Sequence, residues 1–131
     1  LPGIPLAICR PDLSFTLLDS NAKKTRFVQQ AVLELKLTNV KVQHSRVEDF
    51  KPPELFDTVL TRAFAELEEI IRLTRHLLAK NGQLLAMKAN CTNEELAKVT
   101  ANKQIIPVTI PGMAAQRNLV CIQFESTSIG Q

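Results

Sequence analysis

The sequence has little glycine, few cysteines and no long apolar run. Its 131 residues include four glycines, and none of them forms a Gly-x-Gly pair of the kind that cradles a phosphate or a cofactor. The three cysteines, Cys9, Cys91 and Cys121, lie far apart and form no Cys-x-x-Cys pair. This usage is typical of free thiols in a reducing compartment. No apolar run approaches the roughly 20 residues of a membrane-spanning helix.

The bulk composition is that of an ordinary globular domain. Hydrophobic residues make up 45% of the chain and charged residues 22%, and the length suits one domain. A net charge of +3 favours anionic partners mildly and does not by itself indicate nucleic acid. The first residues, LPGIPLAICRPD, show no basic region and no cleavage site of a signal peptide, so we expect a cytoplasmic protein. His44 and His76 are not spaced as metal ligands, and we expect no metal site.

Strand and helix patterns alternate along the chain. Helical spacing predicts a short helix over Ile4–Cys9, a helix that begins after Ser20 or Asn21, a helix over about Glu66–Ala79 that Asn81-Gly82 ends, and a short helix opened by Thr92. Strands are predicted at Phe15–Leu18, Val40–His44, Phe56–Leu60, Gln83–Lys88, Ile105–Ile110 and Leu119–Phe124.

This order predicts an α/β fold. Repeated strand–helix–strand units make right-handed parallel crossovers, whereas the last two strands have no helix between them and should pair as an antiparallel hairpin. A mostly parallel sheet closed by such a hairpin is the arrangement of class I (Rossmann-like) methyltransferases, although other doubly wound folds share the pattern. We expect one domain over residues 1–124 and a polar, frayed tail over 125–131.

Asp19 follows the first predicted strand, where doubly wound sheets bind their ligands. A carboxylate there accepts hydrogen bonds from the ribose hydroxyls of a nucleoside cofactor, either NAD or S-adenosylmethionine. The alternative role is helix capping, but Ser20 and Asn21 already serve that need. We therefore favour ribose binding.

Two further strand ends carry candidate cofactor residues. In the "SRVEDF" turn, the N–H groups of Val47 and Glu48 could bond the edge of an adenine while Val47 packs on its face; the alternative is an acidic surface turn. Arg62 ends the next strand, where a guanidinium needs an anionic or π partner. A salt bridge to Glu48 or Asp49 is the alternative, and both could hold at once.

Basic side chains open the second helix, where the macrodipole disfavours positive charge. Lys23, Lys24 and Arg26 would be explained by a bound anion such as RNA phosphate, and a solvated basic face is an equal alternative. Arg117, in the loop before the last strand, carries the same ambiguity.

Missing motifs narrow the chemistry further. The sequence has no tyrosine. Amino-methylating enzymes of this fold carry an Asn/Asp-Pro-Pro-Tyr/Phe sequence after their fourth strand, which holds an exocyclic amine. Here that position reads Thr61-Arg62-Ala63-Phe64. No cysteine stands where a nucleophile for pyrimidine C5 chemistry is expected. These absences leave, as the methyl acceptor, an atom that is already nucleophilic, such as a ring nitrogen with a free lone pair. Its methylation needs alignment with the methyl donor and no strong base.

Six segments occur here in the order in which they occur in the GidB family, the ribosomal RNA small-subunit methyltransferases G. They are "LPGIPLAI", "FTLLDSNAKKTRF", "HSRVEDF", "FDTVLTRAFA", "LLAMK" and "QRNLV". The sequence thus resembles this family from Leu1 to about Phe124. The resemblance implies S-adenosylmethionine-dependent N7-methylation of a guanine in 16S ribosomal RNA of the small ribosomal subunit.

The resemblance also implies residue roles. Leu1 and Gly3 belong to the cofactor loop, Asp19 is the ribose acid, Val47 and Glu48 lie on the adenine side, and Arg62 lines the cofactor site. Basic family positions facing cofactor carboxylate or RNA are matched by Lys23 or Lys24, Arg46, Lys88 and Arg117. Arg62, Lys88 and Arg117 are the candidates for positioning the reactants. Ala89 stands where the family has glycine, and its β-carbon could narrow the site.

The family begins with a helical segment, a strand and an Asp-x-Gly-x-Gly-x-Gly loop that precede the matched region. In this fold that strand lies between the strands ending at Asp19 and Leu60, so both are expected to be left as adhesive edges. We expect this chain to be a fragment that binds the cofactor poorly, is inactive or weak, and self-associates through those edges. The full-length protein is expected to be a monomer.

Two other function classes fit part of the pattern. A nucleotide-binding oxidoreductase is compatible with Asp19 but lacks the Rossmann glycine fingerprint. A non-enzymatic RNA- or ribosome-binding module would use Lys23, Lys24, Arg26 and Arg117 and would not depend on Asp19.

Overall fold

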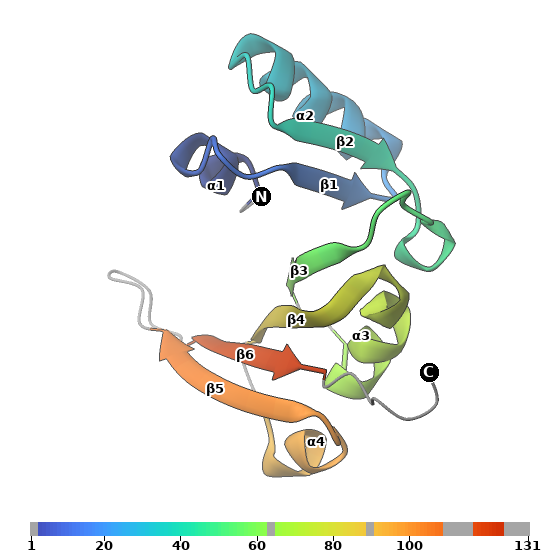
Figure 1. The fold of residues 1–131 in the computed structure, drawn as a ribbon, viewed down its shortest axis with the longest axis vertical. Coiled ribbons are helices and arrows are strands. Elements are labelled where there is room, and N and C mark those ends of the chain that lie inside the picture. Colours follow the sequence, from blue (N-terminus) through green and yellow to red (C-terminus); the bar gives the residue numbers. More distant parts are fainter. Residues whose placement is uncertain (1–2, 63–64, 89–90, 109–116, 125–131) are drawn as a thin grey trace. The chain divides into compact units, whose positions relative to one another are not determined.

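The computed structural model describes residues 3–62, 65–88, 91–108 and 117–124. The chain divides into two compact units, residues 1–50 and 51–131, drawn from blue to red in Figure 1. The prediction of one domain over residues 1–124 stays a prediction, and the expected tail lies outside the described residues. Within the described part of the chain, no helix is long and apolar enough to cross a membrane.

The first unit is a two-stranded parallel sheet with two helices. Its elements are α1 (Gly3–Cys9), β1 (Phe15–Asp19), α2 (Ala22–Glu34), β2 (Val40–His44) and a 3₁₀ turn, η1 (Val47–Asp49). β1 and β2 pair in parallel from Phe15 opposite Val40 to Asp19 opposite His44. Helix α2 makes the crossover between them and buries Val28 and Val32. The two strands and the two helices that the sequence predicts in this region are confirmed.

One side chain, that of Asn39, ties α1 to the start of β2. Its Nδ2 donates to the carbonyl oxygens of Ala7 (3.2 Å), Arg10 (3.2 Å) and Leu13 (3.0 Å). These carbonyls belong to the end of α1 and to the loop that follows it, where backbone acceptors lack helical partners. Asn39 therefore caps the helix from a distant part of the sequence.

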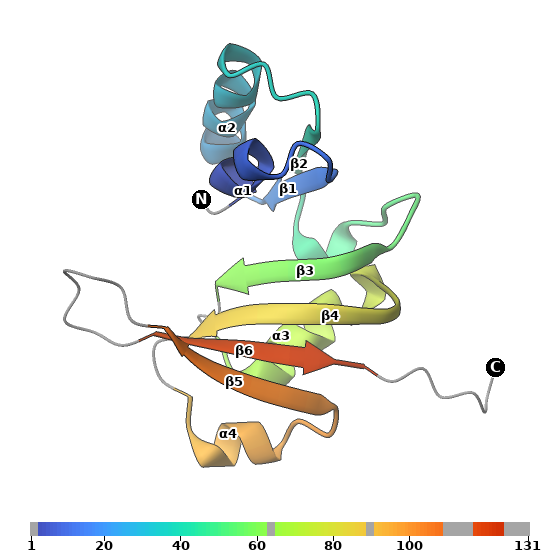
Figure 2. The same ribbon diagram turned by 60° about the vertical axis from the view of Figure 1, so that its left-hand side comes forward.

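The second unit is a mixed four-stranded sheet. Its elements are β3 (Phe56–Arg62), α3 (Leu67–Thr74), the 3₁₀ turn η2 (Arg75–Leu77), β4 (Leu78–Lys88), α4 (Asn93–Ala97), β5 (Asn102–Val108) and β6 (Arg117–Gln123). The strand order is β3-β4-β6-β5 (Figure 2). β3 is parallel to β4, whereas β6 is antiparallel to β4 and to β5. The predicted C-terminal antiparallel hairpin is thus confirmed, with β6 inserted between β4 and β5.

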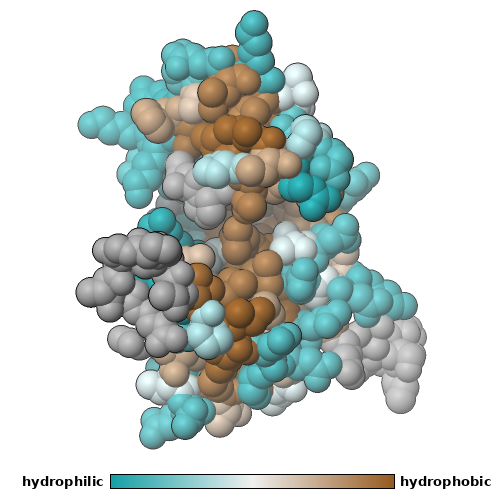
Figure 3. All heavy atoms as spheres, turned by 90° about the vertical axis from the view of Figure 1, so that its left-hand side faces the viewer, coloured by the Kyte–Doolittle hydropathy of each residue, from teal (hydrophilic) through white to brown (hydrophobic). Residues whose placement is uncertain are grey.

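The core of the second unit lies on one face of this sheet. Leu84 of β4 and Val120 and Ile122 of β6 are fully buried, and they pack with Leu67 and Ile70 of α3. Because side chains alternate along a strand, the opposite face carries the half-buried Leu85, Met87 and Leu119. Figure 3 shows apolar side chains at the surface of each unit.

The predicted end of the helix over Glu66–Ala79 is wrong. Helix α3 ends at Thr74, and β4 already begins at Leu78. Asn81-Gly82 lies inside β4, where Asn81 has a φ of 62° and the register with β3 shifts between Phe56 and Thr58. An added Cβ at Gly82 would lie 2.8 Å from the carbonyl oxygen of Ala79. The pair therefore forms a bulge in a strand, and the apolar Leu77 and Leu78 fit a helix and a strand equally well.

β1 and β3 are both edge strands. β1 pairs with β2, β3 pairs with β4, and neither has a second neighbour among the described strands. These are the two strands that the sequence analysis expected to be left as edges. An edge strand presents unpaired backbone N–H and C=O groups.

We expect Asn39→Asp to destabilise the first unit. The substitution keeps the shape of the side chain but removes the N–H donor, and it places carboxylate oxygens against three carbonyl oxygens. The expected loss is about 2 kcal/mol in the free energy of unfolding, measured by hydrogen exchange of amides in residues 3–50. Gln29→Glu, which adds the same charge at an exposed position of α2, is the control. Equal effects of the two substitutions would contradict the capping role.

Candidate functional site

Asp19 lies at the end of β1, in the turn that starts α2. Its Oδ1 accepts a hydrogen bond from the N–H of Asn21 at 2.7 Å, and Asn21 Oδ1 accepts from the N–H of Lys24 at 3.1 Å. The predicted capping of α2 by Asn21 is confirmed. Asp19 also stabilises this turn, through the hydrogen bond that its Oδ1 accepts. Its other oxygen, Oδ2, makes no hydrogen bond within the part of the chain that the structure describes.

The end of β2 is bonded to the same turn. The N–H of Ser45 donates to the carbonyl oxygen of Asp19 at 3.0 Å. His44 Nε2 lies 3.0 Å from the carbonyl oxygen of Ser20, and a carbonyl only accepts, so Nε2 donates. This bond gives His44 a structural role, because it joins the end of β2 to the turn that follows β1.

The turn η1 follows directly at this edge. Its hydrogen bonds run from the N–H of Asp49 to Arg46 and from the N–H of Phe50 to Val47. The N–H groups of Val47 and Glu48 precede these donors, so they are not used in closing the turn. Val47 is half-buried and Glu48 is exposed. The structure therefore brings Asp19 and the Val47–Glu48 turn to one edge of the first unit.

The pleat of the second sheet separates the three positioning candidates. Arg62 pairs in register with Met87, Met87 pairs with Leu119, and Lys88 pairs with Asn118. Because alternate residues point to opposite faces, Arg62 and Arg117 project from the face that carries Met87 and Leu119, at the end where β3 and β4 terminate. Lys88 projects from the other face, towards α3 and α4.

Lys88 is engaged in a buried ion pair. Its Nζ donates to Glu95 Oε2 and to the carbonyl oxygen of Ala65 at 3.0 Å, and Glu95 Oε2 also accepts from the N–H of Leu67 at 2.7 Å. Lys88 and Glu95 are each 8% exposed. We call these four residues the Lys88–Glu95 node. The contact of Lys88 with cofactor or RNA that the resemblance implies stays a prediction, and it would require this pair to break.

Sequence reasoning missed Glu95. Only Thr92 was singled out in this helix, and Thr92 does cap α4 by accepting from the N–H of Glu95 at 3.1 Å. The available signal was Lys88 itself, because it occupies the same strand face as Leu84 and Ala86 and a buried ammonium needs a partner.

Cys91 lies beside this node and has a perturbed thiol. Burial raises the pKa of Cys91, the Glu95 carboxylate raises it further, and the Lys88 ammonium offsets part of the increase. A raised pKa keeps the thiol protonated and unreactive near neutral pH.

Gly3 has a packing reason to be glycine. A Cβ built there would overlap Cδ2 of Leu17 in β1, so a larger residue would require the Leu17 side chain to move. The cofactor role that the resemblance implies for Gly3 stays a prediction. Leu1 and Ala89 lie outside the described residues.

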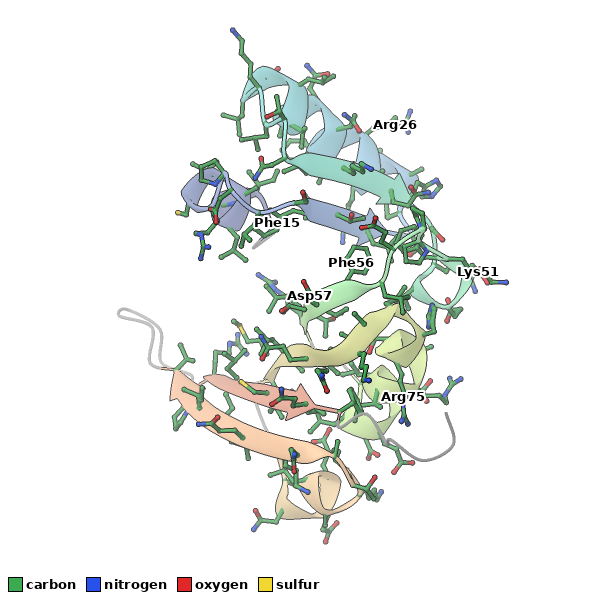
Figure 4. All side chains as sticks on the ribbon, in the orientation of Figure 1. Phe15, Arg26, Lys51, Phe56, Asp57 and Arg75 are labelled. Carbon is green, nitrogen blue, oxygen red and sulfur yellow. The ribbon has the colours of Figure 1, made fainter. Side chains whose placement is uncertain are left out.

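The basic candidates of the first unit are exposed to solvent. Lys23, Lys24 and Arg26 lie in the first turns of α2, and Arg46 precedes η1. Arg26 projects away from α2 in Figure 4. The ion pairs found among the described residues involve none of these four, which leaves their charge available to an anionic partner.

The candidate site is therefore seen in two parts. Asp19, Val47 and Glu48 belong to one unit and Arg62 and Arg117 to the other. Each group lies where strands end, and their convergence on one ligand stays a prediction.

Solved structures define the class of the fold. The structure of M. jannaschii TYW2 in complex with AdoMet matches with a TM-score of 0.71 at 16% identity, covering 95% of this chain and 63% of that one. The apo structure of the S-adenosylmethionine-dependent methyltransferase SibL matches with a TM-score of 0.70 at 15% identity, covering 94% of this chain and 47% of that one. The chain has the α/β fold of the class I, Rossmann-like, S-adenosylmethionine-dependent methyltransferases.

Within that class the sequence defines the family. The sequence model of GidB, rRNA small subunit methyltransferase G, matches residues 1–120. The chain therefore belongs to the GidB family. The ribosomal RNA small subunit methyltransferase G of Chromobacterium violaceum is 52% identical over 123 residues, covering 92% of this chain and 59% of that protein. The Pseudomonas aeruginosa PAO1 protein of the same name is 46% identical over 126 residues, with 94% and 59% covered. The chain thus spans about three-fifths of the length of these relatives.

We expect iodoacetamide to label Cys91 more slowly than the exposed Cys9 at pH 8, by about tenfold, since the thiolate is the nucleophile. Labelling of Cys91 should rise with pH through its raised pKa. Glu95→Gln should accelerate it, because removing the carboxylate lowers that pKa, whereas Glu94→Gln should not. Mass spectrometry of the labelled peptides measures the rates. Labelling of Cys91 as fast as that of Cys9 would contradict this assignment.

Proposed function

We propose that this chain forms part of an S-adenosylmethionine-dependent enzyme that methylates N7 of a guanine in 16S ribosomal RNA of the small ribosomal subunit. Membership of the GidB family supports the activity and the substrate. The single structural observation that carries the proposal is the edge where Asp19 and the Val47–Glu48 turn meet.

That edge fits the nucleoside part of the cofactor. Asp19 Oδ2 accepts from a ribose hydroxyl, while the turn bond to Oδ1 fixes the carboxylate plane. The N–H groups of Val47 and Glu48 bond the adenine edge, and the apolar side chain of Val47 lies against the ring. A rigid turn at each contact lowers the conformational entropy lost on binding.

The chemical step makes modest demands on the protein. When bound, S-adenosylmethionine supplies an electrophilic methyl group, and N7 of guanine carries a free lone pair, so no general base is needed. The residues of this chain bind and orient the reactants, which is the dominant contribution in such a transfer. Arg62 and Arg117 share a face at the strand ends, and they place positive charge where the cofactor carboxylate or an RNA phosphate is held.

Exposed basic side chains supply the RNA contacts. Lys23, Lys24, Arg26 and Arg46 surround the end of the first sheet, and Arg117 adds charge at the end of the second. Phosphate contacts of this kind give affinity and orientation, whereas base contacts give specificity. A ribosomal RNA substrate supports a cytoplasmic location for the protein.

Asp19→Asn and Arg62→Ala should each weaken S-adenosylmethionine binding, by about 10- to 100-fold, because each removes a hydrogen bond to or from a charged group. Because the chain spans 59% of the C. violaceum relative, binding and methyl transfer are measured on a chimera. In it, the residues that precede the matched region in that relative are joined to this chain. Calorimetry gives the Kd, and mapping of the modified base in small-subunit RNA gives the product.

Asp57→Asn is the matched control, because Asp57 is an exposed acid on β3 (Figure 4). Binding of NAD in place of S-adenosylmethionine would favour an oxidoreductase instead. RNA binding without methyl transfer, unaffected by Asp19→Asn and Arg62→Ala, would favour a non-enzymatic binding module.

Replacing Lys23, Lys24 and Arg26 with alanine should weaken RNA binding and flatten its salt dependence. Each lost phosphate contact lowers the slope of log K against log salt by roughly 0.7 to 0.9. Fluorescence anisotropy with a small-subunit RNA fragment over a KCl series measures it. Replacing Lys41, Lys51 and Lys80, which are equally exposed, removes the same charge elsewhere. An equal change of slope in both triple variants would contradict a defined RNA surface on α2.

A further inference from the structure

We propose that Glu95 is a positioning residue of the transfer site, which acts on Arg62 through the Lys88–Glu95 node. The proposal rests on the function proposed above, in which Arg62 lines the cofactor site. Glu95 itself touches no reactant; it holds the segment that connects Arg62 to helix α3.

The node joins three segments that leave the same edge of the sheet. Lys88 is the last residue of β4, and Glu95 lies in α4. Ala65 precedes α3, and Leu67 is its first residue. Glu95 Oε2 accepts hydrogen bonds from the Lys88 ammonium and from the N–H of Leu67. Lys88 Nζ also donates to the carbonyl oxygen of Ala65. Charge-assisted hydrogen bonds between buried groups are strong and little screened by salt.

This arrangement restricts Arg62 from both sides. On the strand side, Arg62 is held by its pairing with Met87, which directly precedes Lys88. On the helix side, the carbonyl of Ala65 and the N–H of Leu67 are both bonded to the node. Arg62 is thus held by β4 at its own position, and the chain is held again by the node from Ala65, three residues further on. The Cα of Arg62, which carries the guanidinium side chain, is therefore held in a defined position at the end of β3.

The node does more than helix capping requires. Glu66, the N-cap residue of α3, makes no side-chain capping bond, and the N–H of Leu67 is satisfied by Glu95 from 28 positions away. A serine or aspartate at the cap would bond the N–H of the second or third helical residue instead, so the N–H of Leu67 needs a partner from outside the local sequence. A buried ion pair carries a desolvation cost that a well-packed apolar pair avoids, so stability alone does not explain its presence. A requirement for a defined geometry at the strand ends does explain it.

Hydrogen exchange of the 131-residue chain tests the node directly. In Glu95→Gln the amide oxygen still accepts but the charge is lost, and we expect the amides of Arg62 and of Ala65–Leu67 to exchange about 5-fold faster. In Glu95→Ala the acceptor is also lost, and about 50-fold is expected. Glu94→Gln and Glu94→Ala, one position away and exposed, should leave these amides unchanged. If the alanine variant does not fold, the glutamine pair alone decides.

The distribution of the change separates positioning from general stabilisation. Faster exchange confined to Arg62 and Ala65–Leu67 supports the proposal. An equal increase throughout β4 and β6, or no increase at all, would overturn it.

A double-mutant cycle in the chimera tests the link to Arg62. Glu95→Gln should weaken S-adenosylmethionine binding by about 5-fold in the wild-type background and by less than about 2-fold beside Arg62→Ala, because the effect passes through that arginine. Methyl-transfer kinetics should show the change in the KM for the cofactor more than in kcat. Additive effects would overturn the positioning role.

The two proposals fail differently. A chimera that binds no S-adenosylmethionine contradicts the proposed function and with it any positioning role of Glu95. A chimera whose cofactor binding depends on Asp19 and Arg62 but not on Glu95 overturns only the further inference.

Discussion

The ion pair between Lys88 and Glu95 is the interaction on which the geometry of the second unit depends. A buried ammonium and a buried carboxylate are each unfavourable alone, and they persist because they satisfy one another and two backbone groups. In doing so they join the end of β4, the start of α3 and the body of α4.

The alternation of side chains along the strands then assigns the basic residues to different tasks. Arg62, Lys88 and Arg117 are all basic and all lie near the end of β3 and β4, and a resemblance of sequence treats them alike. The pleat directs Arg62 and Arg117 to one face and Lys88 to the other, where α3 and α4 exclude water. The charge of Lys88 on the covered face is paired with Glu95 inside the fold, whereas a charge on the opposite face remains available to a ligand.

In the first unit, a few hydrogen bonds around Asp19 join the ends of the two strands. One carboxylate oxygen closes the turn into α2, Ser45 bonds the carbonyl of the same residue, and His44 holds the adjacent peptide. Closing the turn and the proposed ribose binding are therefore compatible for Asp19, because the turn bond uses only one of its two carboxylate oxygens. This arrangement agrees with the class I methyltransferase fold and with membership of the GidB family.

The sequence by itself determined the strands and helices apart from the end of α3, and the parallel order with its antiparallel hairpin. It also determined the cap at Thr92, the choice of Ser20 or Asn21 as the cap of α2, and the family, since each depends on local periodicity or on short motifs. Tertiary structure alone decided where α3 ends, because Leu77 and Leu78 suit a helix or a strand until β3 pairs with one of them. It also decided that Asn39 caps α1, that Gly3 lies against Leu17, and that Glu95 receives Lys88 and Leu67. These contacts join residues that are distant in the sequence and that only folding brings together, so no local pattern encodes them.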